Sequence, residues 1–218
     1  EDADLPELSE ALARDPAEDA SYGERSPYVT PKNLRDTAIS LWSEEKAGNF
    51  HDPACGLGGF LLGALDRVSS SAGDNFSFDD FMRLSGSDSD ASTLSLCKML
   101  FLLRAAKSFE QSSTDVQLGL VDLIGKVAPK LRLEDSLSKL DSKKANKHDF
   151  VACDPPFDEV AVRGGDSTLI HHFFVQIVEE RLADGGSAAI VLPHSYLKSE
   201  RDVFSRRDLL ETGLLKKV

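Results

Sequence analysis

The chain has 218 residues, of which 41% are hydrophobic and 28% are charged. This length supports one well-packed core and excludes two cores of comparable size. The formal charge of −12 argues against a general nucleic-acid-binding surface, because Lys and Arg are what bind phosphates. Residues 1–24, however, contain nine acidic residues and one basic residue, Arg14. The remaining chain therefore has a formal net charge of only −4. We therefore predict an acidic leader over residues 1–24 and one globular domain over residues 25–218.

The sequence contains no signal that directs the protein to a membrane or to secretion, and it contains few cysteines. No apolar stretch approaches the roughly 18–20 residues of a membrane span, and the N-terminal segment lacks the pattern of a signal peptide. The cysteines, Cys55, Cys97 and Cys153, are odd in number and form no CxxC pair, which argues against a disulfide framework or a zinc site. We expect a cytoplasmic protein without a membrane segment. A start without Met and an apolar, strand-like end also predict a fragment of a longer chain.

The predicted elements alternate between helices and short apolar strands. The leader contains at most a short helix over Leu5–Arg14. Thr30 and Pro31 predict a helix start, with a capping hydroxyl followed by proline at the first helical position. In chain order we expect a helix over 31–42, a strand over 49–51, a helix from Gly59, a strand over 82–85, helices over 91–106 and near 116–127, strands over 130–133 and 150–153, a helix over 169–182 closed by Gly185 and Gly186, a strand over 188–192, and a last helix and strand.

This alternation predicts an α/β fold with a doubly wound, mostly parallel sheet and helices on both faces. In such sheets, ligands bind outside the carboxyl ends of the strands. The loop from Asp52 to Phe60 follows the first predicted strand. It lacks a GxGxxG dinucleotide fingerprint, and Asp52 would repel a pyrophosphate. The loop suits a cationic ligand such as S-adenosylmethionine, with Asp52 accepting from the ammonium group and Gly56 and Gly58 making room for the amino acid moiety.

Acidic residues also follow the next two predicted strands. Asp88 is placed to bind the hydroxyls of a ribose, but Asp90 is an equally good helix cap, and sequence alone leaves only a preference for Asp88. Asp135 stands beside the expected position of an adenine amino group, and a solvated acidic turn explains it equally well. His171 and His172 lack the Glu and the spacing of zinc motifs, so no metal site is predicted.

The most specific loop is Asp154-Pro155-Pro156-Phe157, which directly follows an apolar strand. Proline has no N–H group, so the carbonyl groups of this loop remain available as acceptors. Adenine N6 is a poor nucleophile because its lone pair is delocalised into the ring. The Asp154 carboxylate and the Pro155 carbonyl can accept from the two N6 hydrogens, and Phe157 offers a face on which an extruded base can stack.

Asp-Pro-Pro-Phe resembles the catalytic motif of amino-methyltransferases, and the loop from Asp52 to Phe60 resembles their cofactor loop as found in type I modification subunits and similar N6-adenine enzymes. The segment from Tyr28 to Pro31 and residues 185–193 are similar to further motifs of that family, so the resemblance covers about residues 28–218. The family usually has Asn at position 154 and Ser at position 57, where this chain has Asp and Leu.

The resemblance implies the fold of a Rossmann-like class I methyltransferase and a set of site residues. The catalytic residues would be Asp154, Pro155, Pro156 and Phe157. The residues that bind S-adenosylmethionine would be Tyr28, Thr30, Pro31, Asp52, Ala54, Gly56, Gly58, Phe60, Asp88, Asp135 and Asp154, and no metal would take part. The implied partners are double-stranded DNA and either specificity and restriction subunits or a C-terminal recognition domain beyond this sequence.

Three alternatives remain open at this stage. The first is methylation of another planar amine, such as a protein glutamine or an RNA base, although the Thr-Pro helix ahead of the glycine loop favours DNA. A non-catalytic assembly subunit of the same fold is the second alternative. A nicotinamide dehydrogenase is the third, and the absence of a GxGxxG fingerprint argues against it.

Overall fold

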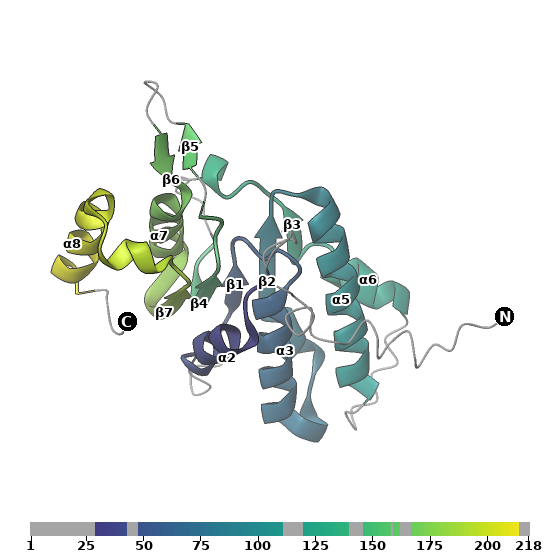
Figure 1. Ribbon diagram of the computed structural model, residues 1–218. Coiled ribbons are helices and arrows are strands. Elements are labelled where there is room, and N and C mark those ends of the chain that lie inside the picture. The colour runs from purple at the N-terminus through teal and green to yellow at the C-terminus, as the bar shows by residue number, and fades with distance from the viewer. Residues whose placement is uncertain are drawn as a thin grey trace.

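The computed structural model describes residues 29–42, 48–110, 120–139, 146–157, 159–161 and 167–213. Its centre is a five-stranded sheet with the order β3-β2-β1-β4-β7, in which every neighbouring pair is parallel (Figure 1). The strands are β1 (Phe50–Asp52), β2 (Leu84–Asp88), β3 (Leu131–Leu133), β4 (His148–Cys153) and β7 (Leu182–Ile190). The predicted parallel α/β sheet is therefore confirmed.

Helices and turns connect these strands. The helices are α2 (Lys32–Ser40), α3 (Gly59–Ala72), α4 (Phe78–Met82), α5 (Ala91–Glu110), α6 (Leu120–Val127), α7 (Ile170–Arg181) and α8 (Val203–Glu211). Short 3-10 turns are η2 (Gly73–Asn75), η3 (Leu137–Lys139), η4 (His194–Leu197) and η5 (Glu200–Asp202). A separate antiparallel pair, β5 (Glu159–Ala161) and β6 (Ser167–Leu169), lies between β4 and α7 in the chain.

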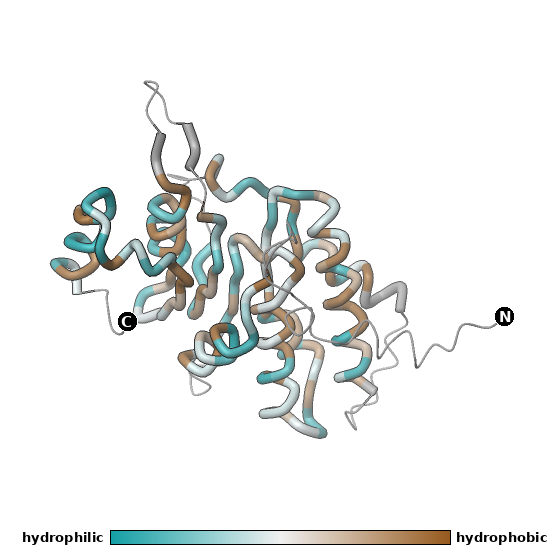
Figure 2. The backbone as a smooth tube through the Cα atoms, in the orientation of Figure 1, coloured by the Kyte–Doolittle hydropathy of each residue, from teal (hydrophilic) through white to brown (hydrophobic). Residues whose placement is uncertain are grey.

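Strand β4 shows that both faces of the sheet are covered. Phe150 and Ala152 belong to the larger buried cluster, which also contains side chains of α2, α3 and α5. Val151 and Cys153 point to the opposite face, where they pack with Phe174 and other side chains of α7. Hydrophobic stretches recur along α5 and α7 in Figure 2. The prediction of helices on both faces is confirmed.

Aromatic rings fix α2 against the sheet. The ring centroids of Trp42 and Phe50 are 5.3 Å apart, and those of Phe50 and Phe150 are 5.8 Å apart. All three side chains are buried. Trp42 follows the end of α2, while the two phenylalanines lie on the neighbouring strands β1 and β4. This cluster therefore holds the Thr30–Pro31 entrance of α2 close to the ends of those two strands.

A buried polar network lies on the face of β1 and β4 opposite to Phe50 and Phe150. The rings of His51 and His148 stack with centroids 4.4 Å apart. Arg181 donates from Nη1 to His51 Nε2 at 3.0 Å and from Nη2 to Glu134 Oε1 at 2.7 Å. His51 Nδ1 then donates to Ser85 Oγ, 3.0 Å away. This arrangement requires a neutral His51, and burial together with the charge of Arg181 lowers the pKa of both histidines, that of His148 to about 4.

Two element predictions were wrong in their boundaries. Gly185 and Gly186 do not close α7, because the helix ends at Arg181 and both glycines lie within β7. The register against β4 shifts there, and Gly185 takes a positive φ of 74° at the irregularity. The second strand was predicted over residues 82–85 and instead runs from Leu84 to Asp88, after the unpredicted helix α4.

Other predictions differ by less or fall outside the described residues. The helix near 116–127 is observed from Leu120, the strand predicted over 188–192 instead runs from Leu182 to Ile190, and the remaining boundaries agree within a few residues. The leader over 1–24, its short helix, and the strand expected after α8 lie outside the described residues. Among the helices that the structure describes, none has the length and apolar character needed to cross a bilayer.

Candidate active site

Four carboxylates follow four adjacent strands at the carboxyl edge of the sheet. Asp135 comes after β3, Asp88 ends β2, Asp52 ends β1 and Asp154 directly follows β4. Their order along the edge is therefore the order of the strands. The chain runs from β1 outward to β2 and β3 and then returns to the other side of β1 with β4. Asp52 and Asp154 thus flank the topological switch point, where doubly wound sheets bind ligands.

Asp52 is 1% exposed and lies at the floor of this edge. Its Oδ1 accepts a hydrogen bond from the backbone N–H of Ala54 at 3.0 Å. Burial raises the pKa of Asp52 well above its usual value, against the effect of that hydrogen bond, and the charges of Asp154 and Asp88 raise it further. A cation bound beside Asp52 would favour the charged carboxylate, so the site is electrostatically suited to a positively charged ligand.

Thr30 connects the start of α2 to the Asp154–Phe157 loop rather than capping its own helix. Its hydroxyl donates to Asp154 Oδ2 at 2.8 Å, across 124 residues of sequence. Pro31 occupies the N-cap position of α2, and no side chain caps this helix end. The prediction of a capping hydroxyl was therefore wrong. Burial raises the pKa of Asp154, and the hydrogen bond from Thr30 partly opposes this shift.

The structure distinguishes the two acids at the end of β2. Asp90 accepts from the backbone N–H of Thr93 at 2.7 Å and so caps α5. Asp88 accepts from the N–H of Gly56 at 2.8 Å through Oδ2 and from that of Asp90 at 2.9 Å through Oδ1. A carboxylate offers about four lone-pair positions, so Asp88 retains capacity for ribose hydroxyls. Asp90 is the helix cap, and Asp88 is the acid that holds the glycine loop.

The backbone conformation at position 58 requires a glycine. Its φ is 90°, and a Cβ atom at this position would lie 2.9 Å from Cys97 Sγ. The left-handed conformation allows the loop to enter α3 directly, with Leu62 N–H bonded to the Gly58 carbonyl at 2.8 Å. The N-terminus of α3, and with it the positive end of the helix dipole, therefore faces the switch point.

The loop after β3 is bonded to the glycine loop. Ser136, which is buried, donates from its hydroxyl to the Pro53 carbonyl at 2.7 Å. Asp135 is exposed, and its Oδ1 accepts from the N–H of Leu137 at 3.0 Å, at the start of η3. Sequence analysis missed the role of Ser136, although it singled out the loop in which this residue lies.

The Asp-Pro-Pro-Phe loop leaves β4 with a buried first proline and an exposed aromatic ring. Pro155 is buried, Pro156 is half-buried and Phe157 is 39% exposed. The ring of Phe157 is therefore accessible at this edge of the sheet.

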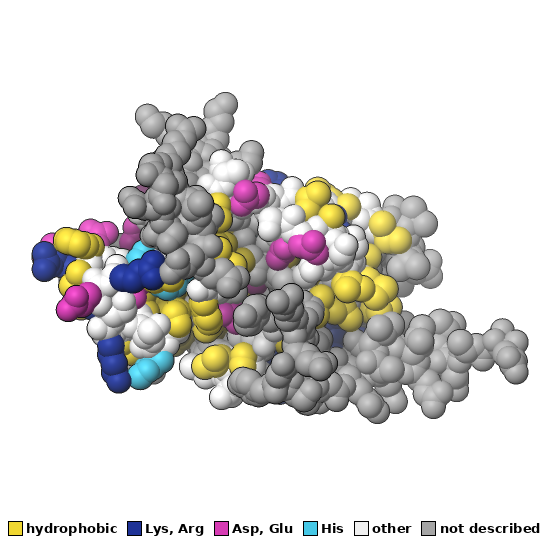
Figure 3. Space-filling model, turned by 45° about the horizontal axis from the view of Figure 1, so that its top comes forward, with side chains coloured by type: hydrophobic (Ala, Val, Ile, Leu, Met, Phe, Trp, Pro, Cys, Tyr) yellow, Lys and Arg dark blue, Asp and Glu magenta, His cyan; other side chains and the backbone are white. Residues whose placement is uncertain are grey.

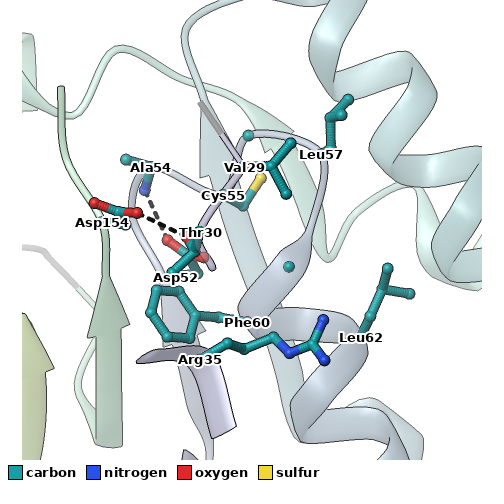
Figure 4. A pocket seen from close by; sticks show the side chains of 12 residues that line it. Val29, Thr30, Arg35, Asp52, Ala54, Cys55, Leu57, Phe60, Leu62 and Asp154 are labelled. Carbon is teal, nitrogen blue, oxygen red and sulfur yellow. Dashed lines mark hydrogen bonds between the residues drawn. The ribbon is translucent and has the colours of Figure 1, made fainter. Parts of the chain in front are cut away.

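A pocket lies between the Val29–Thr30 segment and the glycine loop (Figure 4). It brings together six of the predicted site residues: Thr30, Asp52, Ala54, Gly56, Phe60 and Asp154. Its lining also includes residues that were not predicted as site residues, namely Val29, Arg35, Cys55, Leu57, Gly59 and Leu62. Arg35 follows Pro31 by one helical turn, a spacing that would have indicated its position.

The other predicted site residues lie outside this pocket lining. They are Pro31, Gly58, Asp88, Asp135, Pro155, Pro156 and Phe157. Asp88 and Asp135 lie further along the sheet edge, beyond β1, so the pocket does not extend along the whole row of carboxylates. Tyr28 lies outside the described residues.

The fold and the acidic switch point define a Rossmann-like methyltransferase domain. Two solved structures share this fold. The M protein of the type I restriction enzyme EcoKI is 26% identical, with a TM-score of 0.60, covering 84% of this chain and 38% of that chain. The methyltransferase subunit of a type I restriction-modification system from Streptococcus thermophilus is 19% identical, with a TM-score of 0.58, covering 88% and 40% respectively.

Residues 7–218 match the N-6 DNA methylase family, and the chain belongs to that family. A curated relative, the methylase subunit of the type I restriction enzyme StySPI from Salmonella potsdam, is 28% identical over 217 residues, which is 95% of this chain. The chain spans about two fifths of the length of the curated relatives it matches, since the alignment covers 39% of that subunit.

Proposed function

We propose that the protein binds S-adenosylmethionine and transfers its methyl group to N6 of adenine in DNA, as the modification subunit of a type I restriction-modification system. The observation that carries this proposal is the juxtaposition of Asp52 and Asp154 at the switch point, with Thr30 bonded to Asp154 at 2.8 Å. Family membership and the methylase subunits among its relatives support the same reaction.

The chemistry of the pocket fits the cofactor. S-adenosylmethionine, when bound, supplies an electrophilic methyl group on a positively charged sulfur. Burial raises the pKa of Asp52, the neighbouring carboxylates raise it further, and the ammonium group of the ligand would stabilise its charged form. The N-terminus of α3 provides the complementary site for the carboxylate of the amino acid moiety. Asp88, fixed by Gly56, is the expected ribose partner.

The Asp-Pro-Pro-Phe loop fits the target base. Asp154 Oδ and the Pro155 carbonyl are the expected acceptors for the two hydrogens of N6. Accepting from both hydrogens pulls the nitrogen toward a pyramidal geometry and localises its lone pair. The lone pair would form the N–C bond as the bond from the methyl group to sulfur breaks, which leaves a neutral thioether, and the nitrogen would then lose one proton to water. Phe157, which is exposed, supports the base after it has left the duplex.

The proposed partners follow from the size and charge of the chain. Because the chain spans about two fifths of the length of its relatives and its formal charge is −12, of which −4 falls on residues 25–218, we place the main DNA contacts outside it. Specificity and restriction subunits, or a C-terminal recognition domain of the longer protein, would supply them. A cytoplasmic location is part of the same proposal.

Calorimetric titration with S-adenosylmethionine, with NAD as the comparison ligand, tests the cofactor. We expect binding of S-adenosylmethionine alone, weakened in Asp52→Asn and unchanged in Asp90→Asn, because Asn also caps a helix. The full-length protein, assembled with its subunits, is then assayed for transfer of a tritiated methyl group to duplex DNA. Tight binding of NAD, or cofactor binding without methylation of any adenine-containing duplex, would refute the proposed activity.

A further inference from the structure

A second group of potential ligand atoms lies away from the pocket, between the start of α7 and η5. His171 Nε2 is 3.0 Å from Asp202 Oδ1, and His172 Nε2 contacts the same oxygen. The three ligand atoms all lie within 4.8 Å of one another. The histidines are adjacent in sequence, but Asp202 follows them by 30 residues. No local sequence spacing therefore reveals the cluster.

The burial of this cluster is unusual for such polar groups. His171 and Asp202 are each 1% exposed, whereas the side chain of His172 retains 21% exposure. A buried carboxylate is destabilising unless it is paired or coordinates a metal. Two imidazoles converge on one of its oxygens, and the half-buried His172 leaves a route from solvent. Figure 3 shows histidine side chains at the surface near the end of the molecule formed by η5 and α8.

We propose that His171, His172 and Asp202 bind one zinc ion. Two imidazole nitrogens and one carboxylate oxygen are a ligand set that zinc accepts with a water molecule in the fourth position. Zinc binds these atoms at about 2.0–2.2 Å, so neighbouring ligand atoms are roughly 3.0–3.5 Å apart. The separation of 3.0 Å between His171 Nε2 and Asp202 Oδ1 falls in this range. The ligand atoms of the three residues span up to 4.8 Å, so zinc would draw the two imidazole nitrogens together around the carboxylate oxygen.

The ring nitrogen of His171 that would not bind zinc predicts a site of moderate affinity. Zinc on Nε2 requires the ring proton to be on Nδ1, and His171 Nδ1 is buried without a hydrogen-bond partner among the described residues. Lack of such an outer partner weakens zinc binding by about 10–100-fold relative to a fully supported site. We therefore expect a dissociation constant about 10–100-fold higher than that of a zinc site whose ligating imidazoles all have such partners.

The proposed ion would attach the C-terminal helical segment to the domain. Within η4, η5 and α8, the buried side chains are Tyr196 and Asp202, and α8 itself has none. Tyr196 packs edge-on against His171, with ring centroids 5.6 Å apart. The cluster is thus part of the contact that holds this segment on α7, so zinc bound there would stabilise the segment.

The test uses full-length protein freed of metal with EDTA and titrated with zinc chloride. We expect one zinc ion per chain by elemental analysis, a rise of several degrees in unfolding temperature, and visible absorption bands from bound cobalt(II) used in place of zinc. His172→Ala should abolish all three effects. His194→Ala, which changes an exposed histidine of η4, should leave them intact.

The competing account is a carboxylate hydrogen-bonded to two neutral imidazoles. It predicts an unfolding temperature that does not respond to zinc or EDTA, and that result would overturn the proposal. Equal zinc binding by the wild-type protein and His172→Ala would overturn it as well. Both outcomes are independent of methyl transfer, so they do not bear on the proposed enzymatic activity.

Discussion

Replacement of Asp154 separates the charge of this side chain from its ability to accept a hydrogen bond. Asp154→Asn keeps an oxygen acceptor for Thr30 or for adenine N6, whereas Asp154→Ala removes it. Charge-assisted hydrogen bonds are about twice as strong as neutral ones, which are worth roughly 1 kcal/mol. We therefore expect Asp154→Asn to lose about 1–1.5 kcal/mol of transition-state stabilisation, or about tenfold in rate. Asp154→Ala should lose at least about 100-fold.

The pH dependence of the same variants is the sharper test. Burial raises the pKa of Asp154 above its usual value. Below this raised pKa the carboxyl group is protonated and only a neutral acceptor remains, so the wild-type rate should fall on the acidic side toward the roughly tenfold lower rate expected of Asp154→Asn. Asparagine does not titrate, so the acidic limb should disappear in Asp154→Asn. Thr30→Val should move the wild-type limb to higher pH, because the hydroxyl of Thr30 opposes the shift.

The assay is incorporation of tritiated methyl groups into duplex DNA by the full-length complex between pH 5 and pH 8. Saturating S-adenosylmethionine removes the contribution of Asp52 to cofactor binding. An acidic limb that persists unchanged in Asp154→Asn would show that another group controls the rate. A wild-type rate in Asp154→Ala would remove this residue from the reaction altogether.

Three further perturbations have effects of known direction. Asp52→Ala should weaken S-adenosylmethionine binding by about 1.5–3 kcal/mol in calorimetry, and equal affinities would contradict its assignment to the ammonium group. Gly58→Ala should lower the free energy of unfolding by about 2–4 kcal/mol in urea, because φ is 90° and the new Cβ would lie 2.9 Å from Cys97 Sγ; a loss under about 0.5 kcal/mol would refute this. Acidification from pH 7 to pH 5 should destabilise the wild-type protein by about 2 kcal/mol through His148, because the unfolded chain binds its proton near pH 6.5 and the folded chain only near the pKa of about 4. His148→Gln should reduce that slope, and an unchanged slope would exclude His148 as its source.

The sequence predicted those parts of the fold whose signals are local. Short apolar runs between helical patterns marked the strands of the sheet, and their alternation with helices specified parallel pairing. Where a local signal competed with tertiary structure, the prediction failed. Gly185 and Gly186 have the composition of a helix end, yet the pairing of β7 with β4 extends through them, and the positive φ of Gly185 accommodates the shifted register. The strand order itself carried no local signal.

The site shows the same division between local and long-range information. An acid at the end of a strand is visible in sequence, so Asp52, Asp88 and Asp154 were found at the correct edge. Thr30 followed by Pro31 also has the appearance of a helix cap, and nothing nearby in the sequence indicates another partner. Only the packing of α2 against β1 and β4, through Trp42, brings its hydroxyl to Asp154.

This contact has a chemical consequence that the motifs alone do not show. Asp154 would otherwise be a buried carboxyl group whose pKa rises because of burial, and the hydroxyl of Thr30 opposes that rise. Thr30 therefore helps to keep Asp154 in the charged form, which is the form that the proposed acceptance from adenine N6 requires. Binding of a cation beside Asp52 would lower the pKa of both acids in the same direction. Cofactor binding and activation of the target amine are thus expected to be coupled through a single cluster of carboxylates.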